Sequence, residues 1–326
     1  MTNGSRPRIV VGFGRSGTTW VQDVVAESND LRAVFEPLHP ALVRNAGLTY
    51  LDYREPDDED PDLRAYLERY ISGDFHSLWA DYRFVPTSLW FRPHENLSVD
   101  SLRRVFRSQR RAVRNVLSYR KQRRFAGRVV KLVRASMMLS WLQRTFNARM
   151  VYIVRHPVAV VMSKLRAPYA WNCRSMLGRY KEDRRWMQAL DKDFSNLLTD
   201  NLSDTEAHTL QWSIEVQVAL QQARAAGIPV VSYEQLVENS DNQWPRIWNA
   251  LELEKSPDVE LVSAPSQQAW GESARSADAV RMKYMAWMSR CDAETLASVE
   301  RILDATGMRL YSVNRALPED EAPFKD

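Results

Sequence analysis

The fold is decided by one stretch near the start of the chain, Arg8-Ile9-Val10-Val11-Gly12-Phe13-Gly14-Arg15-Ser16-Gly17-Thr18-Thr19-Trp20. Its first part is a short apolar run rich in β-branched residues, which predicts a buried strand. A glycine-rich turn follows, and the pattern from Trp20 to Glu27 indicates a helix. Gly12 and Gly17 stand at the spacing of a phosphate-binding loop, in which N–H groups at a helix N-terminus point at an anion. The alternative is a glycine-rich turn that binds nothing.

The residues after Gly17 depart from the loop that binds nucleoside triphosphates. Such loops continue with Lys and then Ser or Thr, so that the lysine contacts the β- and γ-phosphates and the hydroxyl contacts magnesium. Here these positions are Thr18 and Thr19, and the cation stands inside the loop at Arg15. Without that lysine and an evident magnesium carboxylate, the loop is poorly suited to γ-phosphoryl transfer. It suits a 5′-phosphate that carries one transferable anionic group.

A second anion-binding pattern lies in residues 150–163. A strongly apolar strand ends at Arg155, and Pro157 stands where a helix can begin. Ser163 follows two turns along that helix. The arginine supplies a charged fork suited to phosphate, and the serine supplies one more hydrogen-bond donor. If both patterns hold opposite ends of one nucleotide, Arg155 must face the turn at residues 14–19 within a nucleotide's length.

The two patterns together resemble the donor site of sulfotransferases that use 3′-phosphoadenosine 5′-phosphosulfate (PAPS). Gly14 to Trp20 is similar to the 5′-phosphosulfate loop, and Arg-x-Pro with the serine eight residues after the arginine is similar to the 3′-phosphate motif. The resemblance implies an α/β fold with a central, mostly parallel sheet flanked by helices, of the P-loop-NTPase-like type. It also implies PAPS as the donor, adenosine 3′,5′-bisphosphate (PAP) as the product, and no metal. The implied donor-binding residues are Gly14, Arg15, Ser16, Gly17, Thr18, Thr19, Trp20, Arg155, Ser163 and, on a looser match, Arg275.

Candidate catalytic groups follow the next strands. Glu36 ends a short strand before Pro37, which favours an extended backbone at Glu36. Phe-Glu-Pro-Leu there resembles carbohydrate-type sulfotransferases, which implies that Glu36 is the general base, with His39 as the alternative. Arg15 is implied to stabilise charge on the leaving oxygen. Lys131, in a Lys-x-x-Arg that ends the strand from residue 127, is expected either to contact the transferred group or acceptor or to pair with a carboxylate.

Length and composition are those of an ordinary folded protein of 326 residues. We expect one domain over 1–317, with insertions at about 41–125 and 165–205, and a disordered acidic tail over 318–326. Further helices are predicted at 135–146, from Ser203 or Asp204 to Ala226, and at 292–306, with a strand at 228–234. Two cysteines, no room for a signal peptide and no membrane-length apolar run favour a cytoplasmic protein.

Charge is distributed unevenly along the chain. Residues 101–181 contain 21 Lys and Arg and no Asp or Glu, and a helix with a basic face is predicted over 102–124. No nucleic-acid-binding signature accompanies it, so we expect a small-molecule or carbohydrate acceptor and no nucleic acid. Two other functions stay open, namely a P-loop kinase for a nucleotide or small molecule, and a non-enzymatic binder of polyanions. The oligomeric state, the acceptor and the choice between O- and N-sulfation are not readable from the sequence.

Overall fold

The computed structural model describes residues 6–48, 51–72, 80, 125–167, 172–263, 284–320 and 322–324. Within these ranges a five-stranded sheet has the strand order β2-β3-β1-β4-β5, and every neighbouring pair is parallel. Its strands are β1 (Arg8–Gly12), β2 (Leu31–Phe35), β3 (Gly127–Leu132), β4 (Arg149–Val154) and β5 (Val230–Ser232). The predicted α/β class with a central parallel sheet is therefore confirmed.

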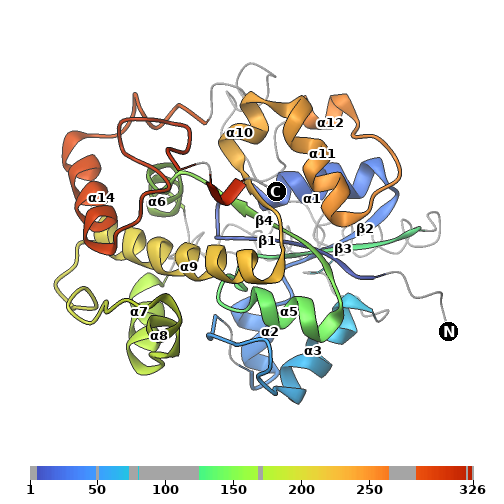
Figure 1. Ribbon diagram of the computed structural model, residues 1–326, viewed down its shortest axis with the longest axis horizontal. Helices are drawn as coiled ribbons and strands as arrows, with labels where there is room; N and C mark the ends of the chain where they lie inside the picture. Colours follow the sequence, from blue (N-terminus) through green and yellow to red (C-terminus); the bar gives the residue numbers. More distant parts are fainter. Residues whose placement is uncertain are drawn as a thin grey trace, which may run out of the picture.

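Helices cover both faces of the sheet (Figure 1). On one side are α1 (Thr18–Ser28), α10 (Tyr233–Glu238), α11 (Ser240–Leu251) and α12 (Val259–Ser263). On the other are α2 (Pro40–Asn45), α3 (Pro61–Ile71), α5 (Leu139–Phe146) and α9 (Asp204–Ala226). The remaining elements are α6 (Pro157–Leu165), α7 (Cys173–Glu182), α8 (Arg185–Leu190), α14 (Ala293–Thr306) and the short 3₁₀ helix η4 (Ala322–Phe324).

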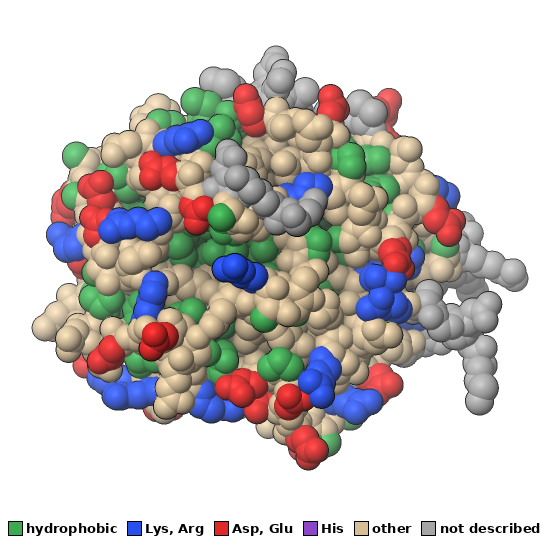
Figure 2. Space-filling view, in the orientation of Figure 1, with side chains coloured by type: hydrophobic (Ala, Val, Ile, Leu, Met, Phe, Trp, Pro, Cys, Tyr) green, Lys and Arg blue, Asp and Glu red, His purple; other side chains and the backbone are tan. Residues whose placement is uncertain are grey.

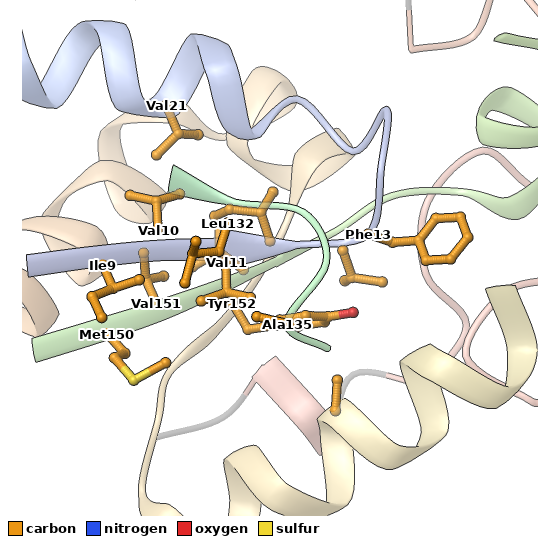
Figure 3. Packing of buried hydrophobic residues seen from close by; sticks show 14 of the residues in the cluster. Ile9, Val10, Val11, Phe13, Val21, Leu132, Ala135, Met150, Val151 and Tyr152 are labelled. Atoms are coloured by element: carbon orange, nitrogen blue, oxygen red, sulfur yellow. The ribbon is translucent and has the colours of Figure 1, made fainter. Parts of the chain in front are cut away.

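The core lies on both faces of β1, the central strand. Val10 points toward Val21 of α1, whereas Ile9 and Val11 point to the opposite face (Figure 3). Residues 9–12 are all buried, as expected for a parallel strand covered by helices on both sides. One polar side chain joins helix to sheet, because the Gln22 Nε2 of α1 donates to Val34 O at 2.8 Å and to Val129 O at 3.0 Å.

Two long helices begin and end where their capping residues predict. The Ser203 side chain and Glu206 form a reciprocal capping box at the start of α9, and Gly227 ends the helix in the left-handed conformation. Asp292 caps α14, and Gly307 ends it in the same way. These local signals were sufficient to predict both helices.

Three expectations about secondary structure are wrong in part. Helix α5 begins at Leu139, not at residue 135, because residues 135–138 form a turn in which Met138 N donates to Ala135 O. Strand β5 ends at Ser232, because the Ser232 side chain caps α10. At the C-terminal end, η4 is ordered and Phe324 is buried in the main core, so this part of the tail is folded.

Several sequence predictions lie outside the described residues. They are the basic helix at 102–124 and the loop with Arg275. The insertion at 165–205 is described in large part, and its helices α7 and α8 share a second apolar cluster with α9, centred on Trp186. No helix among the described residues has the length and apolarity needed to cross a membrane.

Candidate active site at the carboxyl ends of the strands

The turn between β1 and α1 has the shape of an anion cradle. At Gly17, φ is 86°, and an added Cβ would lie 2.4 Å from the Tyr233 ring. At Gly12 an added Cβ would lie 2.4 Å from the Ile153 carbonyl oxygen. Both positions therefore require glycine, one for its conformation and both for the close approach of neighbouring groups. No side chain caps the N-terminus of α1, which leaves its first amides able to bind an anion.

The predicted loop residues line this cradle. Ser16, Thr18, Thr19 and Trp20 are all buried, and Gly14 lies in the turn. The buried Ser16 hydroxyl has no hydrogen-bond partner among the described residues. An unpartnered buried hydroxyl is costly unless a ligand satisfies it. The turn therefore fits a phosphate or phosphosulfate group.

Arg155 and Ser163 lie against the same turn. Arg155 follows β4, and its Nη1 donates to the Arg15 carbonyl oxygen at 3.2 Å. Arg15 in turn donates from Nε to Ser163 Oγ at 2.9 Å. Arg15 has a φ of 75°, a region that non-glycine residues seldom adopt. The Arg155 guanidinium therefore lies directly against the turn at residues 14–19.

Tyr233 joins the two cradles. The Arg155 guanidinium lies 4.3 Å from the centroid of the Tyr233 ring, and the same ring occupies the space that a side chain at Gly17 would need. Trp20 packs edge-on against the same ring at a centroid distance of 5.7 Å. The sequence indicated only that Tyr233 belongs to the predicted strand at 228–234. In the structure it is the surface on which the arginine and the loop are both positioned.

A buried glutamate anchors Arg155 from behind. Glu234 is completely buried, and its carboxylate accepts hydrogen bonds from His156 N at 3.0 Å and from the Tyr311 hydroxyl at 2.8 Å. His156 also stacks on Trp287 with ring centroids 4.2 Å apart, and its Nε2 lies 2.9 Å from Ser312 O. Residues 284–312 therefore fix the backbone beside Arg155. No sequence pattern indicated this anchor, since its members are up to 156 residues apart.

Glu36 is held by cations and an amide. Its side chain is 3% exposed, and its oxygens lie 3.3 Å from Lys131 Nζ and 3.3 Å from Arg134 Nη1. Val133 N also donates to Glu36 Oε1 at 3.0 Å. The expected extended backbone at Glu36 is wrong: its φ is 45°, because its N–H bonds to Lys131 O and its carbonyl accepts from His39 N in a turn.

Lys131 connects Glu36 to the phosphate loop. Its Nζ donates to Thr19 Oγ1 at 2.9 Å and lies 3.7 Å from the centroid of the Phe35 ring. Burial lowers the pKa of Lys131 to about 8, and the Glu36 carboxylate opposes that shift. Of the two roles expected for Lys131, pairing with a carboxylate is the one present in this structure.

His39 stands one turn beyond Glu36 and is neutral at physiological pH. Burial, with a further contribution from the Arg134 charge, lowers the pKa of His39 to about 4. A neutral imidazole can accept a proton, so His39 is a chemically competent alternative base.

The sheet edge as a whole is positively charged. Arg15, Lys131, Arg134 and Arg155 come from three different segments, and the carboxylates described above beside them are those of Glu36 and Glu234. In the space-filling view, Lys and Arg side chains are spread among acidic and apolar ones over the face shown (Figure 2). Such a site attracts a ligand that carries several negative charges.

The sequence model of the sulfotransferase family matches residues 7–257. The chain belongs to the sulfotransferase family. The matched range spans both cradles, Glu36 and Tyr233.

A search of solved structures finds sulfotransferases at low sequence identity. The sulfotransferase domain from the curacin biosynthetic pathway is 13% identical, with 94% of this chain and 99% of that chain covered and a TM-score of 0.44. The sulfotransferase domain from the Synechococcus PCC 7002 olefin synthase is 14% identical, with 92% and 96% covered and a TM-score of 0.39. Sulfotransferase STF9 from Mycobacterium avium is 15% identical, with 88% and 77% covered and a TM-score of 0.31. A comparison with curated protein sequences gives no match.

Proposed function

We propose that this sulfotransferase moves the sulfuryl group from PAPS to a hydroxyl group of a small molecule or carbohydrate. The observation that carries the proposal is the hydrogen bond from Arg155 to the Arg15 carbonyl, which joins a cation suited to a 3′-phosphate to a loop suited to a 5′-phosphosulfate. A donor with phosphate at only one end would leave one of the two cradles without a ligand. The unpartnered Ser16 hydroxyl and the glycine-lined turn support the same donor.

Each part of the donor would have its own residues. The loop from Gly14 to Thr19 would hold the 5′-phosphate through backbone amides and the two threonine hydroxyls. Arg155 would hold the 3′-phosphate. The Ser163 hydroxyl would bind the same phosphate once its hydrogen bond with Arg15 is broken. Trp20 and Arg275 are proposed as further donor contacts. Among the described residues no group of three or more His, Cys, Asp or Glu is arranged to hold a metal ion.

Transfer requires one proton acceptor and one stabilised leaving oxygen. In the proposed reaction the acceptor oxygen forms a bond to sulfur while the bond from sulfur to the bridging oxygen breaks, and PAP leaves with that electron pair. Glu36 takes the proton of the acceptor hydroxyl. Arg15 and the loop amides stabilise the negative charge that develops on the bridging oxygen. Lys131 is placed to assist, because it already bonds to Thr19 at the loop.

The pairing of Glu36 with two cations has a consequence for its role as base. Lys131 and Arg134 hold the carboxylate in place and contact both of its oxygens. An acceptor hydroxyl would therefore share a Glu36 oxygen with one of these cations when its proton is taken. His39 is the second candidate, favoured by its neutral state.

The resemblance at Phe-Glu-Pro-Leu supports a sugar, a glycosylated molecule or another natural product as acceptor, with an amine as the alternative. Both cysteines are free in the structure, which fits a reducing compartment, and we propose the cytoplasm.

The decisive experiment combines binding and turnover. Purified protein is titrated with PAP and then incubated with ³⁵S-labelled PAPS and a panel of hydroxyl and amine acceptors. We expect PAP binding without added metal and label transfer to at least one class of acceptor. Transfer of phosphate from ATP with magnesium, with no response to PAPS, would instead favour a kinase. Nucleic-acid binding with a steep salt dependence that survives loss of Arg15 and Arg155 would favour a polyanion binder.

A further inference from the structure

A buried lysine lies directly behind the donor loop. Lys164 follows Ser163 on α6 and is 4% exposed, and its Nζ lies 3.8 Å from the centroid of the Phe13 ring. Phe13 belongs to the turn between β1 and α1, and it projects past the end of β1, away from the sheet (Figure 3). The Lys164 side chain therefore packs against a side chain of the same turn that forms the proposed donor loop.

The lysine belongs to a polar network inside the protein. Its Nζ donates to Gln211 Oε1 at 3.4 Å, and Gln211 Nε2 donates to Glu215 Oε1 at 2.8 Å. The Tyr180 hydroxyl donates to the same carboxylate oxygen at 2.8 Å. Glu215 is 1% exposed. Charges this deeply buried interact strongly with one another, because little solvent separates them.

Two opposing influences act on the protonation of Lys164 and Glu215. Burial lowers the pKa of Lys164, and the Glu215 carboxylate raises it. Burial raises the pKa of Glu215, and the Lys164 ammonium lowers it. The pair exchanges protons as a unit, so a change in the charge nearby shifts the proton occupancy of both.

Titratable and charged groups on the elements that pack around Lys164 also bear on its pKa. Arg15 of the donor loop and Arg134 after β3 carry the same charge as Lys164 and lower its pKa. A thiolate at Cys173 of α7 would favour the charged form of Lys164, but burial raises the pKa of that thiol. His208 of α9 lies close enough for the Lys164 charge to contribute to the lowering of its pKa by burial. From α14, which also packs on α6, Arg301 is exposed and pairs with Glu206.

We propose that Lys164 takes up a proton from solvent when a phosphorylated nucleotide fills the donor loop, so that its positive charge depends on nucleotide binding. This inference rests on the proposed function. In the free protein the positive charges of Arg15 and Arg134 disfavour an ammonium group behind Phe13. A bound anion neutralises that repulsion, and the ammonium group so formed then strengthens anion binding across the turn. Lys164 is thus a positioning residue that acts through the loop, with no contact to the transferred group.

The test is the number of protons exchanged when PAP binds. Calorimetric titrations at pH 7.5 in two buffers of different ionisation enthalpy give that number for the wild type and for Lys164→Arg. Arginine keeps a permanent charge, so it retains the cation but exchanges no proton. We expect the wild type to take up on the order of half a proton more per nucleotide than Lys164→Arg. The phosphates of PAP titrate near pH 6 in both proteins, so their contribution cancels.

Two further variants complete the design. Lys164→Met combined with Glu215→Gln removes both charges and avoids an unpaired buried carboxylate; we expect PAP affinity to fall about three- to ten-fold. Lys255→Met is the matched control, because Lys255 is exposed and pairs with Asp30 before β2. The PAP affinity of this variant and its proton uptake on PAP binding should equal those of the wild type. If the double variant does not fold, the comparison with Lys164→Arg alone decides.

Equal proton uptake in the wild type and Lys164→Arg would overturn the inference and leave the proposed function intact. Absence of PAP binding by the wild type would instead refute the proposed function itself. The two failures are therefore distinguishable in one set of titrations.

Discussion

Arg155 and Arg15 are 140 residues apart in sequence, yet the guanidinium of the first donates a hydrogen bond to the carbonyl of the second at 3.2 Å. The contact exists because β1 and β4 are parallel neighbours, so the segments that follow them leave the sheet at the same edge. It also places a permanent positive charge beside a turn whose amides attract anions. The donor site is consequently one structure made from two segments, and each can be tested separately.

Replacing Arg155 with Ala should weaken binding of PAP about 10- to 100-fold, because a charge-assisted pair of hydrogen bonds to the 3′-phosphate is lost. Binding of adenosine 5′-phosphate, which has no 3′-phosphate, should change less than about threefold. Calorimetric titration with the two nucleotides measures both constants. Arg309→Ala, at an exposed arginine that pairs with Asp304, is the control. An equal loss for both nucleotides would remove Arg155 from the 3′-phosphate site.

Replacing Glu36 with Gln should reduce turnover about 10²- to 10⁴-fold, since the amide cannot take the acceptor's proton. PAP affinity should stay within about threefold, because the substitution leaves the loop and both neighbouring cations in place. Initial rates with labelled PAPS and a separate PAP titration make the comparison.

The control for that experiment is His39→Asn. If Glu36 is the base, this variant keeps most of its turnover. Should Glu36→Gln retain turnover within a few-fold while His39→Asn loses it, His39 is the base and the Glu36 carboxylate serves to position Lys131 and Arg134.

Tyr233 offers a test of the surface shared by the two cradles. Tyr233→Ala removes the ring that lies beneath the Arg155 guanidinium and beside Gly17, and PAP affinity should fall about tenfold or more. Tyr233→Phe keeps the ring and should bind PAP within about threefold of the wild type. A similar loss in both variants would show that the hydroxyl matters and the ring contact does not.

His156 should make stability fall in acid. Burial lowers its pKa to about 3, so the folded protein keeps the imidazole neutral while the unfolded chain protonates it below about pH 6.5. The unfolded state binds more protons in this window, and the free energy of unfolding therefore decreases as the pH falls, by up to about 1.4 kcal/mol per pH unit for this histidine.

The matched variant is His156→Asn, because asparagine also accepts a hydrogen bond at a helix N-cap, as His156 Nδ1 does from Val158 N. Urea denaturation between pH 7 and 5 should show a shallower pH dependence for the variant, although it is less stable overall through loss of the stack on Trp287. Identical slopes would mean that His156 binds protons equally in the folded and unfolded states, so that its pKa is not lowered by burial.

The parts of the site that the sequence predicted are those encoded in short segments. Glycine spacing in the first loop, and the arginine, proline and serine after β4, place functional groups by local geometry, and a parallel sheet then brings their segments to one edge. The partners of Glu36 are not encoded in one short segment. The extended backbone expected before Pro37 is overridden by a hydrogen bond to Lys131 O, a residue 95 positions away in the sequence.

Long-range packing also explains what was missed. Lys164 and Glu215 lie in helices that are far apart in the sequence, and only the packing of α6 against α9 brings them together. Tyr233 fell at the end of a predicted strand, and nothing local shows that its ring faces Gly17. The acidic composition of the tail likewise gave no sign that Phe324 packs into the core.

The contacts of Tyr311 and Ser312 with Glu234 and His156 affect the order of events during synthesis. The ribosome delivers the phosphate loop before Arg155, and the residues that fasten the backbone beside Arg155 emerge more than 150 residues later still. A nascent chain therefore cannot complete the proposed nucleotide pocket until Tyr311 and Ser312 have left the exit tunnel. Premature termination anywhere upstream of Tyr311 should yield a polypeptide that is unable to retain the nucleotide.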